Sequence, residues 1–270
     1  RGNLSEKKVF LGDEIYTTKY IHDFENRPSV VYYPDGNIDE FLYLEGIVLK
    51  RRFIEEDGKV REQNLIYDDT GGLYHVLLEL DEQGRPLKRY ILSDRTDEIM
   101  WVREFEEENG DEPKDNLYYH TDHLGSVVIL TDERGKKSAE YEYLPFGEIL
   151  EAKGERAKKN FYSFTGREYL ERLGMYDYRA RIYDPRVGRF VQVDPLNVPK
   201  KYLYVENNPI IKIDRTGTQV GVYQPIETAP SVCWIPVEGG TTLATVSEKY
   251  EVARLCRTIE SWAPKYPGFG

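Results

Sequence analysis

Two aspartates in the C-terminal half of the sequence have surroundings that suit acid–base chemistry. Asp194 follows Val-Gln-Val and Asp214 follows Ile-Lys-Ile, so each is expected to lie at the end of a strand. If these strand ends are adjacent, the two carboxyl groups come close together. Two close carboxyl groups cannot easily both ionise, so one would act as a base on water while the other polarises a carbonyl. The alternative is that each aspartate only forms a turn, which is the more frequent role after a strand.

Histidine and cysteine provide weaker candidates. His120 and His123 flank Asp122, but positions three apart on an extended strand face opposite sides, so a shared metal ion would need a turn. Hydrogen bonding within a tight turn is the simpler interpretation. Cys233 and Cys256 would pair in an oxidising compartment or remain two buried thiols, and their spacing suits no zinc site. We therefore predict neither a metal nor a cofactor.

Length and charge exclude several classes of protein. The chain has 270 residues, 40% of them hydrophobic and 31% charged, with a formal net charge of −11. This is enough for one large domain or two ordinary ones. The negative charge argues against nucleic acid as the main partner, because a phosphate backbone would repel it, and no apolar run reaches the length of a membrane span. The chain starts at Arg1 without an initiator methionine, so we expect a piece of a longer protein.

Strand signals dominate the pattern along the chain. Runs rich in tyrosine and β-branched residues are broken by Gly about every ten residues. Asp35-Gly36, Asp57-Gly58 and Gln83-Gly84 are predicted hairpin turns, because Gly tolerates the positive φ that such turns require. A weak Tyr and Asp repeat at intervals of about 50 residues favours stacked hairpins that share a sheet. The predicted fold class is mainly β, with short helices near 165–174 and 246–262.

Five blocks of sequence carry a resemblance to a known family. They are YYHTDHLGSV (118–127), YEYLPFGE (141–148), FTGRE (164–168), GMYDYRARIYDPRVGRFVQVDPL (174–196) and KYLYVENNPIIKIDRTG (201–217). In this order they resemble the Rhs-associated core of the Rhs (YD-repeat) family. The resemblance divides the chain into degenerate YD-repeat hairpins at 1–117, the core at 118–217 and a variable C-terminal tail at 218–270.

The family resemblance implies both a fold and a reaction. YD repeats form a β-hairpin ribbon that spirals into a hollow shell, and the core curls inward to plug one end. Many members also cut the chain just after the core, by chemistry similar to that of aspartic proteases. Carried over to this sequence, the catalytic residues are Asp194, Asp214 and Arg181. An arginine beside the two carboxyl groups would favour their charged form and stabilise developing negative charge.

The segment after the second aspartate departs from the family pattern, which reads Asp-Pro-x-Gly followed by Leu or Met. Here Arg215 replaces the proline and Thr218 replaces the large apolar residue. The spacer between Asp194 and Asp214 is also short. Arg215 is expected to lower the pKa of Asp214. The sequence therefore leaves both a cleaving and a non-cleaving chain open.

We predict the shell-and-plug portion of a secreted Rhs/YD-repeat protein of the polymorphic-toxin type, which encloses or presents a C-terminal segment. One alternative is a self-cleaving aspartic peptidase that releases the tail near 217–219. Another is an extracellular adhesion or assembly module that associates with further copies of itself. The expected partners are the chain's own C-terminal tail or cargo and upstream YD repeats of the same protein. The expected location is outside a bacterial cell or on its surface.

Overall fold

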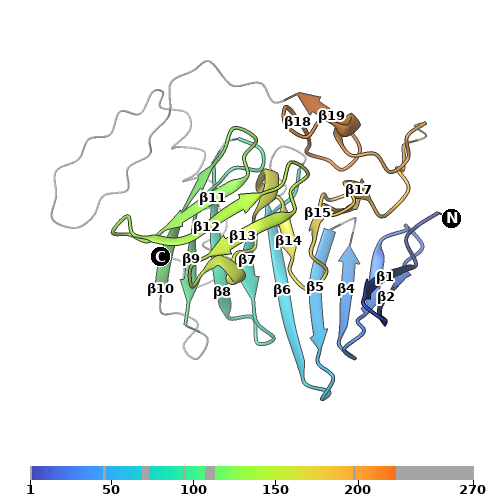
Figure 1. Ribbon diagram of the computed structural model, residues 1–270. Helices are drawn as coiled ribbons and strands as arrows, with labels where there is room; N and C mark the ends of the chain where they lie inside the picture. The colour runs from blue at the N-terminus through green and yellow to red at the C-terminus, as the bar shows by residue number, and fades with distance from the viewer. Residues whose placement is uncertain are drawn as a thin grey trace. The chain divides into compact units, whose positions relative to one another are not determined.

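One antiparallel sheet of 13 strands forms the first layer of the protein (Figure 1). The computed structural model describes residues 2–44, 47–68, 73–93, 95–106, 113–196 and 199–222. Each strand pairs with its neighbours in sequence, so the sheet, called the wall below, is a meander. Its strands are β1 (Glu6–Leu11), β2 (Glu14–His22), β3 (Pro28–Tyr32), β4 (Ile38–Leu44), β5 (Ile47–Ile54), β6 (Val60–Asp68), β7 (His75–Leu80), β8 (Pro86–Leu92), β9 (Ile99–Phe105), β10 (Pro113–Thr121), β11 (Val127–Thr131), β12 (Lys137–Tyr143) and β13 (Ile149–Lys153). The mainly β fold predicted from sequence is confirmed.

A recurring Asp-x-x-Gly turn joins many of these strands. In the turn between β7 and β8, the Asp81 carboxylate accepts hydrogen bonds from the amides of Gln83 (2.9 Å) and Arg85 (2.8 Å). Gly84 closes the turn at a φ of 79°, in the left-handed region that disfavours a side chain. The three hairpin turns predicted at Gly36, Gly58 and Gly84 are all present with positive φ.

Residues after β13 fold back onto the wall instead of extending it. This part, called the core segment below, comprises residues 154–196 and 199–222. Its strands β14–β17 form a four-stranded antiparallel sheet, and β18 pairs with β19. Its elements are η1 (Ala157–Lys159), η2 (Phe164–Gly166), β14 (Glu168–Leu170), β15 (Met175–Asp177), β16 (Ile182–Asp184), β17 (Arg189–Phe190), η3 (Val205–Asn207), β18 (Lys212–Asp214) and β19 (Val220–Val222), where η denotes a 3₁₀ helix.

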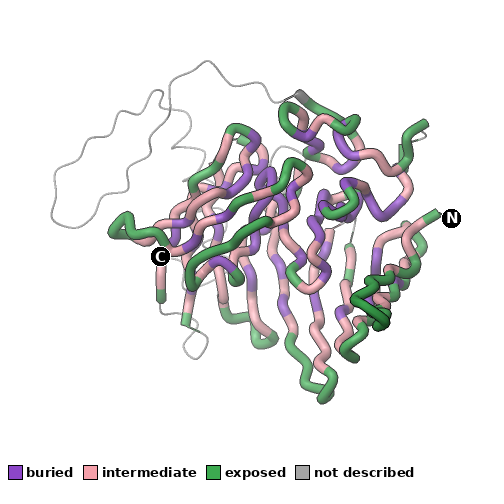
Figure 2. The backbone as a smooth tube through the Cα atoms, viewed as in Figure 1, coloured by how far each residue is buried: buried purple, intermediate pink, exposed green. Residues whose placement is uncertain are grey.

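Buried ion pairs and aromatic rings join the wall to the core segment. Two buried pairs are Arg51–Glu168 at 2.7 Å and Arg167–Asp97 at 2.8 Å, and a partly buried one is Arg172–Asp39 at 3.0 Å. Phe161 and Tyr162 pack with Tyr90 of β8 in one hydrophobic cluster. Separating the layers would strand buried charges, which is costly, so these pairs favour one seating of the core segment. The N-terminal strands β1 and β2, by contrast, are mostly exposed (Figure 2).

The helix predicted at 165–174 is wrong. The chain there makes the short η2 turn, with Thr165 at a φ of 50°, and then enters strand β14. In the extended backbone, the side chain of Arg167 pairs with Asp97 and that of Glu168 pairs with Arg51, so both have buried partners on the wall. Gly174 closes a turn instead of a helix. The helix predicted at 246–262 lies outside the described residues, as do Cys233 and Cys256, and the boundaries at 117 and 217 remain predictions.

Candidate functional site

The core segment brings Asp194 and Asp214 together around Arg181. The Nη2 atom of Arg181 lies 2.9 Å from Oδ2 of Asp194 and 3.7 Å from Oδ2 of Asp214. All three side chains are at most 5% exposed. The two carboxyl groups, 20 positions apart in sequence, therefore share one guanidinium nitrogen in a site with little access to water.

Each member of the site is held by the local backbone. Arg181 follows the tight turn between β15 and β16, in which the Tyr178 amide donates to the Arg181 carbonyl at 2.9 Å. Asp194 is not at the strand end that was predicted, because β17 ends at Phe190; its amide donates to the Lys201 carbonyl at 2.9 Å. Asp214 is the last residue of β18, which agrees with the strand end predicted from its β-branched neighbours.

Arg181 is fixed by more than its two carboxylate partners. Its Nη1 donates to the Lys201 carbonyl at 3.1 Å, and its Nε donates to the Gly217 carbonyl. The guanidinium also lies 3.6 Å from the centre of the Phe190 ring, a cation–π contact. Burial lowers the pKa of Arg181, and the two aspartates oppose that effect. Arginine remains charged under these conditions because its ordinary pKa is so high.

Asp214 begins an Asp-x-x-Gly turn. Turns of the same type join strands of the wall. The Oδ1 atom of Asp214 accepts hydrogen bonds from the amides of Thr216 (3.2 Å), Gly217 (2.8 Å) and Thr218 (3.2 Å). Unlike Asp81, it is almost fully buried. Burial raises the pKa of Asp214, although backbone amides and Arg181 oppose this. The turn role and the acid–base role are therefore compatible in one residue.

The peptide bond between Thr218 and Gln219 lies directly beside this carboxyl group. The Gln219 amide nitrogen is 3.2 Å from Oδ1 of Asp214. Burial, not Arg215, dominates the pKa of Asp214 and raises it. The Arg215 carbonyl instead accepts a hydrogen bond from Arg179, and the Thr218 hydroxyl lies 3.0 Å from that of Thr216.

Arg179 is a residue that sequence reasoning missed. In the sequence it stands in an alternating run with Asp177 and Arg181, a pattern that is typical of an ordinary salt-bridged strand face. The structure places it in a turn, with its guanidinium against Asp97 of the wall at 2.6 Å. The signal that could have found it is its position two residues before Arg181, in a segment whose backbone must reverse between β15 and β16.

The two candidate metal-binding histidines have separate partners. His120 Nε2 lies 3.0 Å from the Thr131 hydroxyl, and His123 Nε2 lies 2.9 Å from the Ile210 carbonyl. Within the described ranges, no group of three or more His, Cys, Asp or Glu residues is arranged to hold a metal ion. His123 instead joins the turn between β10 and β11 to the residues just before β18.

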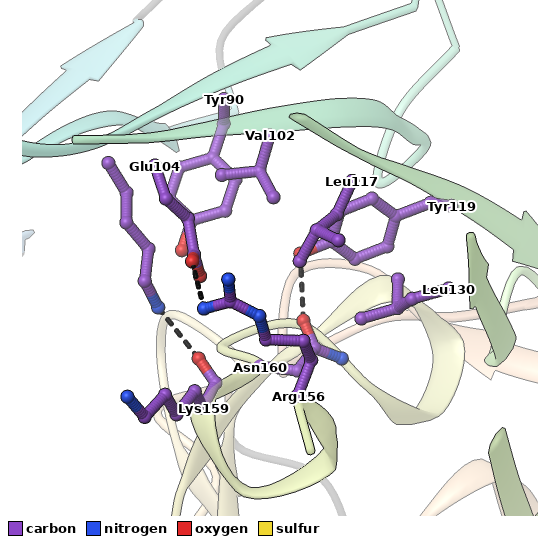
Figure 3. Close-up of a pocket in the computed structure, with 10 residues that line it drawn as sticks. Tyr90, Val102, Glu104, Leu117, Tyr119, Leu130, Arg156, Lys159 and Asn160 are labelled. Atoms are coloured by element: carbon purple, nitrogen blue, oxygen red, sulfur yellow. Dashed lines mark hydrogen bonds and ion pairs between the residues drawn. The ribbon is translucent and has the colours of Figure 1, made fainter. Parts of the chain in front are cut away.

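A small cavity between the wall and η1 is lined by paired polar groups (Figure 3). Arg156 reaches across it to Glu104, and the Tyr119 hydroxyl donates to Asn160 at 2.7 Å. The space left is ≈10 Å³, about one water molecule at most. The residues that line this cavity therefore hold the start of the core segment against the wall, and the cavity is too small for a substrate.

His75 makes the contact between wall and core segment sensitive to pH. Its Nδ1 lies 3.7 Å from Oδ1 of Asp97, and its ring lies beside the Arg179 guanidinium. Burial, opposed by Asp97 and reinforced by Arg179, lowers the pKa of His75 from 6.5 to about 4. The unfolded chain therefore binds this proton at a higher pH than the folded chain. The stabilisation is complete above the unfolded pKa of 6.5 and is lost as the pH falls toward 4.

We expect the His75→Gln variant to lose less stability on acidification than the wild type. Between neutral pH and pH 4 the wild type should lose about 3 kcal/mol more unfolding free energy, since one pKa unit corresponds to about 1.4 kcal/mol. Urea denaturation at both pH values measures this difference, with the exposed His120→Gln as control. Parallel pH profiles for the wild type and His75→Gln would show that His75 is not held uncharged.

Comparison with known proteins relates part of the chain to a family. Residues 109–211 match the model of the teneurin YD-shell. The chain is 38% identical over 108 residues to salivary gland surface protein 1 of Aedes aegypti, and 31% identical over 170 residues to the tRNA nuclease WapA of Bacillus subtilis. The matched part of the chain is similar to proteins of the Rhs/YD-repeat family. The fold of the wall is consistent with a portion of a YD shell.

The Rhs/YD-repeat relatives are much longer than this chain. The two matches cover 38% and 60% of the chain but only 3% and 7% of the relatives. The solved Photorhabdus luminescens Tc holotoxin pore with the mutation TccC3-D651A aligns at a TM-score of 0.60 and 16% identity, over 78% of this chain and 10% of that one. This structural likeness supports the YD-shell fold.

The family match covers only part of the candidate site. The matched range contains Arg181 and Asp194 but ends before Asp214. The catalytic roles of the three residues therefore remain a prediction. Within the part of the chain that the structure describes, there is no helix long and apolar enough to cross a membrane.

Proposed function

We propose that this chain encloses or presents the segment that follows its core, as part of a secreted Rhs/YD-repeat protein of the polymorphic-toxin type. The observation that carries the proposal is the seating of the core segment on the wall. Buried ion pairs such as Arg51–Glu168 and Arg167–Asp97 tie the two layers together. The last described strand, β19, belongs to this double layer and pairs with β18. The proposed partners are this C-terminal segment and upstream YD repeats of the same protein.

Protease protection tests enclosure. In the full-length protein, the C-terminal segment is expected to survive a dose of proteinase K that degrades the same segment expressed alone. Equal degradation of the two would overturn enclosure. Quantitative mass spectrometry of peptides from the C-terminal segment provides the readout.

We propose as a second function that the site hydrolyses the bond between Thr218 and Gln219. The observation that favours it is the position of Asp214, whose Oδ1 is 3.2 Å from the nitrogen of that bond. Arg181 lies between the two carboxyl groups and also binds the Gly217 carbonyl, one residue before Thr218. The arginine thus aligns the backbone of the bond with the acid–base pair.

The proposed reaction assigns different roles to the two carboxyl groups. Asp194, ion-paired with Arg181 at 2.9 Å, accepts a proton from water as the water oxygen attacks the Thr218 carbonyl carbon. Asp214 retains a proton more readily because burial raises its pKa. In the intact chain its Oδ1 accepts the Gln219 N–H; once water has added to the Thr218 carbonyl, the Gln219 nitrogen becomes basic and takes the proton of Asp214 as the bond breaks. One water is consumed, and the products are a carboxyl group at Thr218 and an amino group at Gln219.

Intact-mass spectrometry tests self-cleavage directly. Purified chain incubated at mildly acidic to neutral pH is expected to convert into two pieces, residues 1–218 and 219–270. Sequencing of the smaller piece should begin at Gln219. A single unbroken mass at every pH would rule out hydrolysis by this site.

A further inference from the structure

Arg179 connects the wall to the loop that carries the candidate cleavage site. Its Nη2 donates to Oδ1 of Asp97 at 2.6 Å, and its Nε donates to the Tyr74 carbonyl at 3.1 Å. Its Nη1 donates to the carbonyl of Arg215, the residue after Asp214. One planar guanidinium with donors on three nitrogens thus joins groups of the wall to a carbonyl of the loop.

The backbone conformation at Arg179 allows its side chain to contact both the wall and the loop. Arg179 has a φ of 67°, in the left-handed region that residues with a side chain rarely adopt. Its amide donates to Oδ1 of Asp177 at 2.7 Å, which holds this conformation. The next amide, of Ala180, donates to the Thr216 carbonyl at 3.3 Å. The turn between β15 and β16 therefore lies along the cleavage loop.

The wall provides a firm anchor for Arg179. Asp97, in the turn between β8 and β9, has a side chain that is 7% exposed. Its Oδ1 also accepts a hydrogen bond from Arg167 at 2.8 Å. Two arginines therefore hold the Asp97 carboxylate in place. One of them, Arg179, also holds the Arg215 carbonyl of the loop.

The contact with the loop bears on the geometry of Asp214. A peptide group is planar, so the Arg215 carbonyl and the Thr216 amide turn as one unit. That same Thr216 amide donates to Oδ1 of Asp214 at 3.2 Å. By holding the carbonyl end of this peptide group, Arg179 keeps its amide end aimed at the Asp214 carboxyl. The Arg179 guanidinium makes these contacts without touching Asp194, Asp214 or the Thr218–Gln219 bond.

We propose that Arg179 is a positioning residue that makes the cleavage loop depend on a correctly assembled wall. The effect of Arg179 on the cleavage rate rests on the proposed self-cleavage. Its hold on the loop rests only on its own contacts. Cleavage would then require that the wall around Tyr74 and Asp97 has folded and received the core segment. Self-cleavage before shell assembly would be slow, because the loop would lack its anchor.

The rate of self-cleavage tests the consequence. In Arg179→Ala we expect the piece 1–218 to form at least tenfold more slowly than in the wild type, with an unchanged pH profile. The matched control is Arg172→Ala, which removes another arginine between core segment and wall, bound to Asp39 at 3.0 Å, and should cleave at the wild-type rate. A wild-type rate in Arg179→Ala, or a shifted pH profile, would overturn the proposal.

Trypsin provides a readout that does not need self-cleavage. The bond after Arg215 is a trypsin site whose carbonyl is held by Arg179, so the fragment 1–215 should form at least tenfold faster in folded Arg179→Ala than in the wild type. Arg172→Ala should behave as the wild type. If the wild type never cuts itself, the proposed hydrolysis fails, and trypsin still decides the role of Arg179. Equal trypsin rates in Arg179→Ala and the wild type would overturn that role.

Discussion

An Asp214→Asn chain is expected to remain in one piece under conditions in which the wild type separates at Thr218–Gln219. Asparagine keeps an oxygen that can accept the turn amides, but its NH2 group is far too weak an acid to transfer a proton to the Gln219 nitrogen. Loss of a positioned acid or base costs at least about 100-fold in rate. Intact mass followed over time measures the loss, and Asp194→Asn should be impaired through loss of the base.

Asp132→Asn is the matched control for this experiment. Asp132 makes the same kind of turn, with Oδ1 accepting the amides of Arg134 (2.9 Å) and Lys136 (2.8 Å). It is not one of the carboxylates paired with Arg181. We expect Asp132→Asn to cleave as the wild type does. If Asp214→Asn also cleaved at the wild-type rate, Asp214 would be a turn residue and nothing more.

Gly166→Ala should produce the largest loss of stability. Gly166 has a φ of 67°, and a Cβ atom there would lie 2.0 Å from the Asp97 carbonyl oxygen. Left-handed strain costs about 1 kcal/mol, and overpacking against rigid backbone adds a further 1–3 kcal/mol or so. We therefore expect a loss of about 3 kcal/mol in unfolding free energy, measured by urea denaturation.

Gly135→Ala separates the two contributions. Gly135 has a φ of 74°, but an added Cβ would meet nothing within 4 Å. Only the strain of about 1 kcal/mol should remain. Similar losses in Gly135→Ala and Gly166→Ala would mean that the core segment does not lie against Asp97 as closely as the structure has it.

Local chemistry made much of the wall predictable. Turns at Asp35-Gly36, Asp57-Gly58 and Gln83-Gly84 depend on residues next to each other in sequence, since Gly alone readily adopts the positive φ required. The strand end at Asp214 followed from its β-branched neighbours. That Asp194, Asp214 and Arg181 share a site came instead from the family resemblance, because nothing local indicates which strand ends will be adjacent.

Contacts between distant segments account for what the sequence did not reveal. The pattern at 165–174 favours a helix by its cap and its final glycine. The ion pairs of Arg167 with Asp97 and Glu168 with Arg51 join residues 70 and 117 positions apart, and they select a strand. The same applies to Arg179, whose partner Asp97 is 82 positions away. The raised pKa of Asp214 likewise follows from burial by the folded chain.

The most direct measurement is a titration of the aspartate side chains by ¹³C NMR. Both site aspartates lie before the proposed cut, so cleavage does not remove either from the folded piece. The account predicts that Asp214 titrates above the ordinary value of 3.8. It also predicts that Asp194→Asn lowers the pKa of Asp214, because a negative neighbour is lost and Arg181 is left to Asp214 alone. An ordinary pKa for Asp214 that does not respond to Asp194→Asn would contradict the shared site.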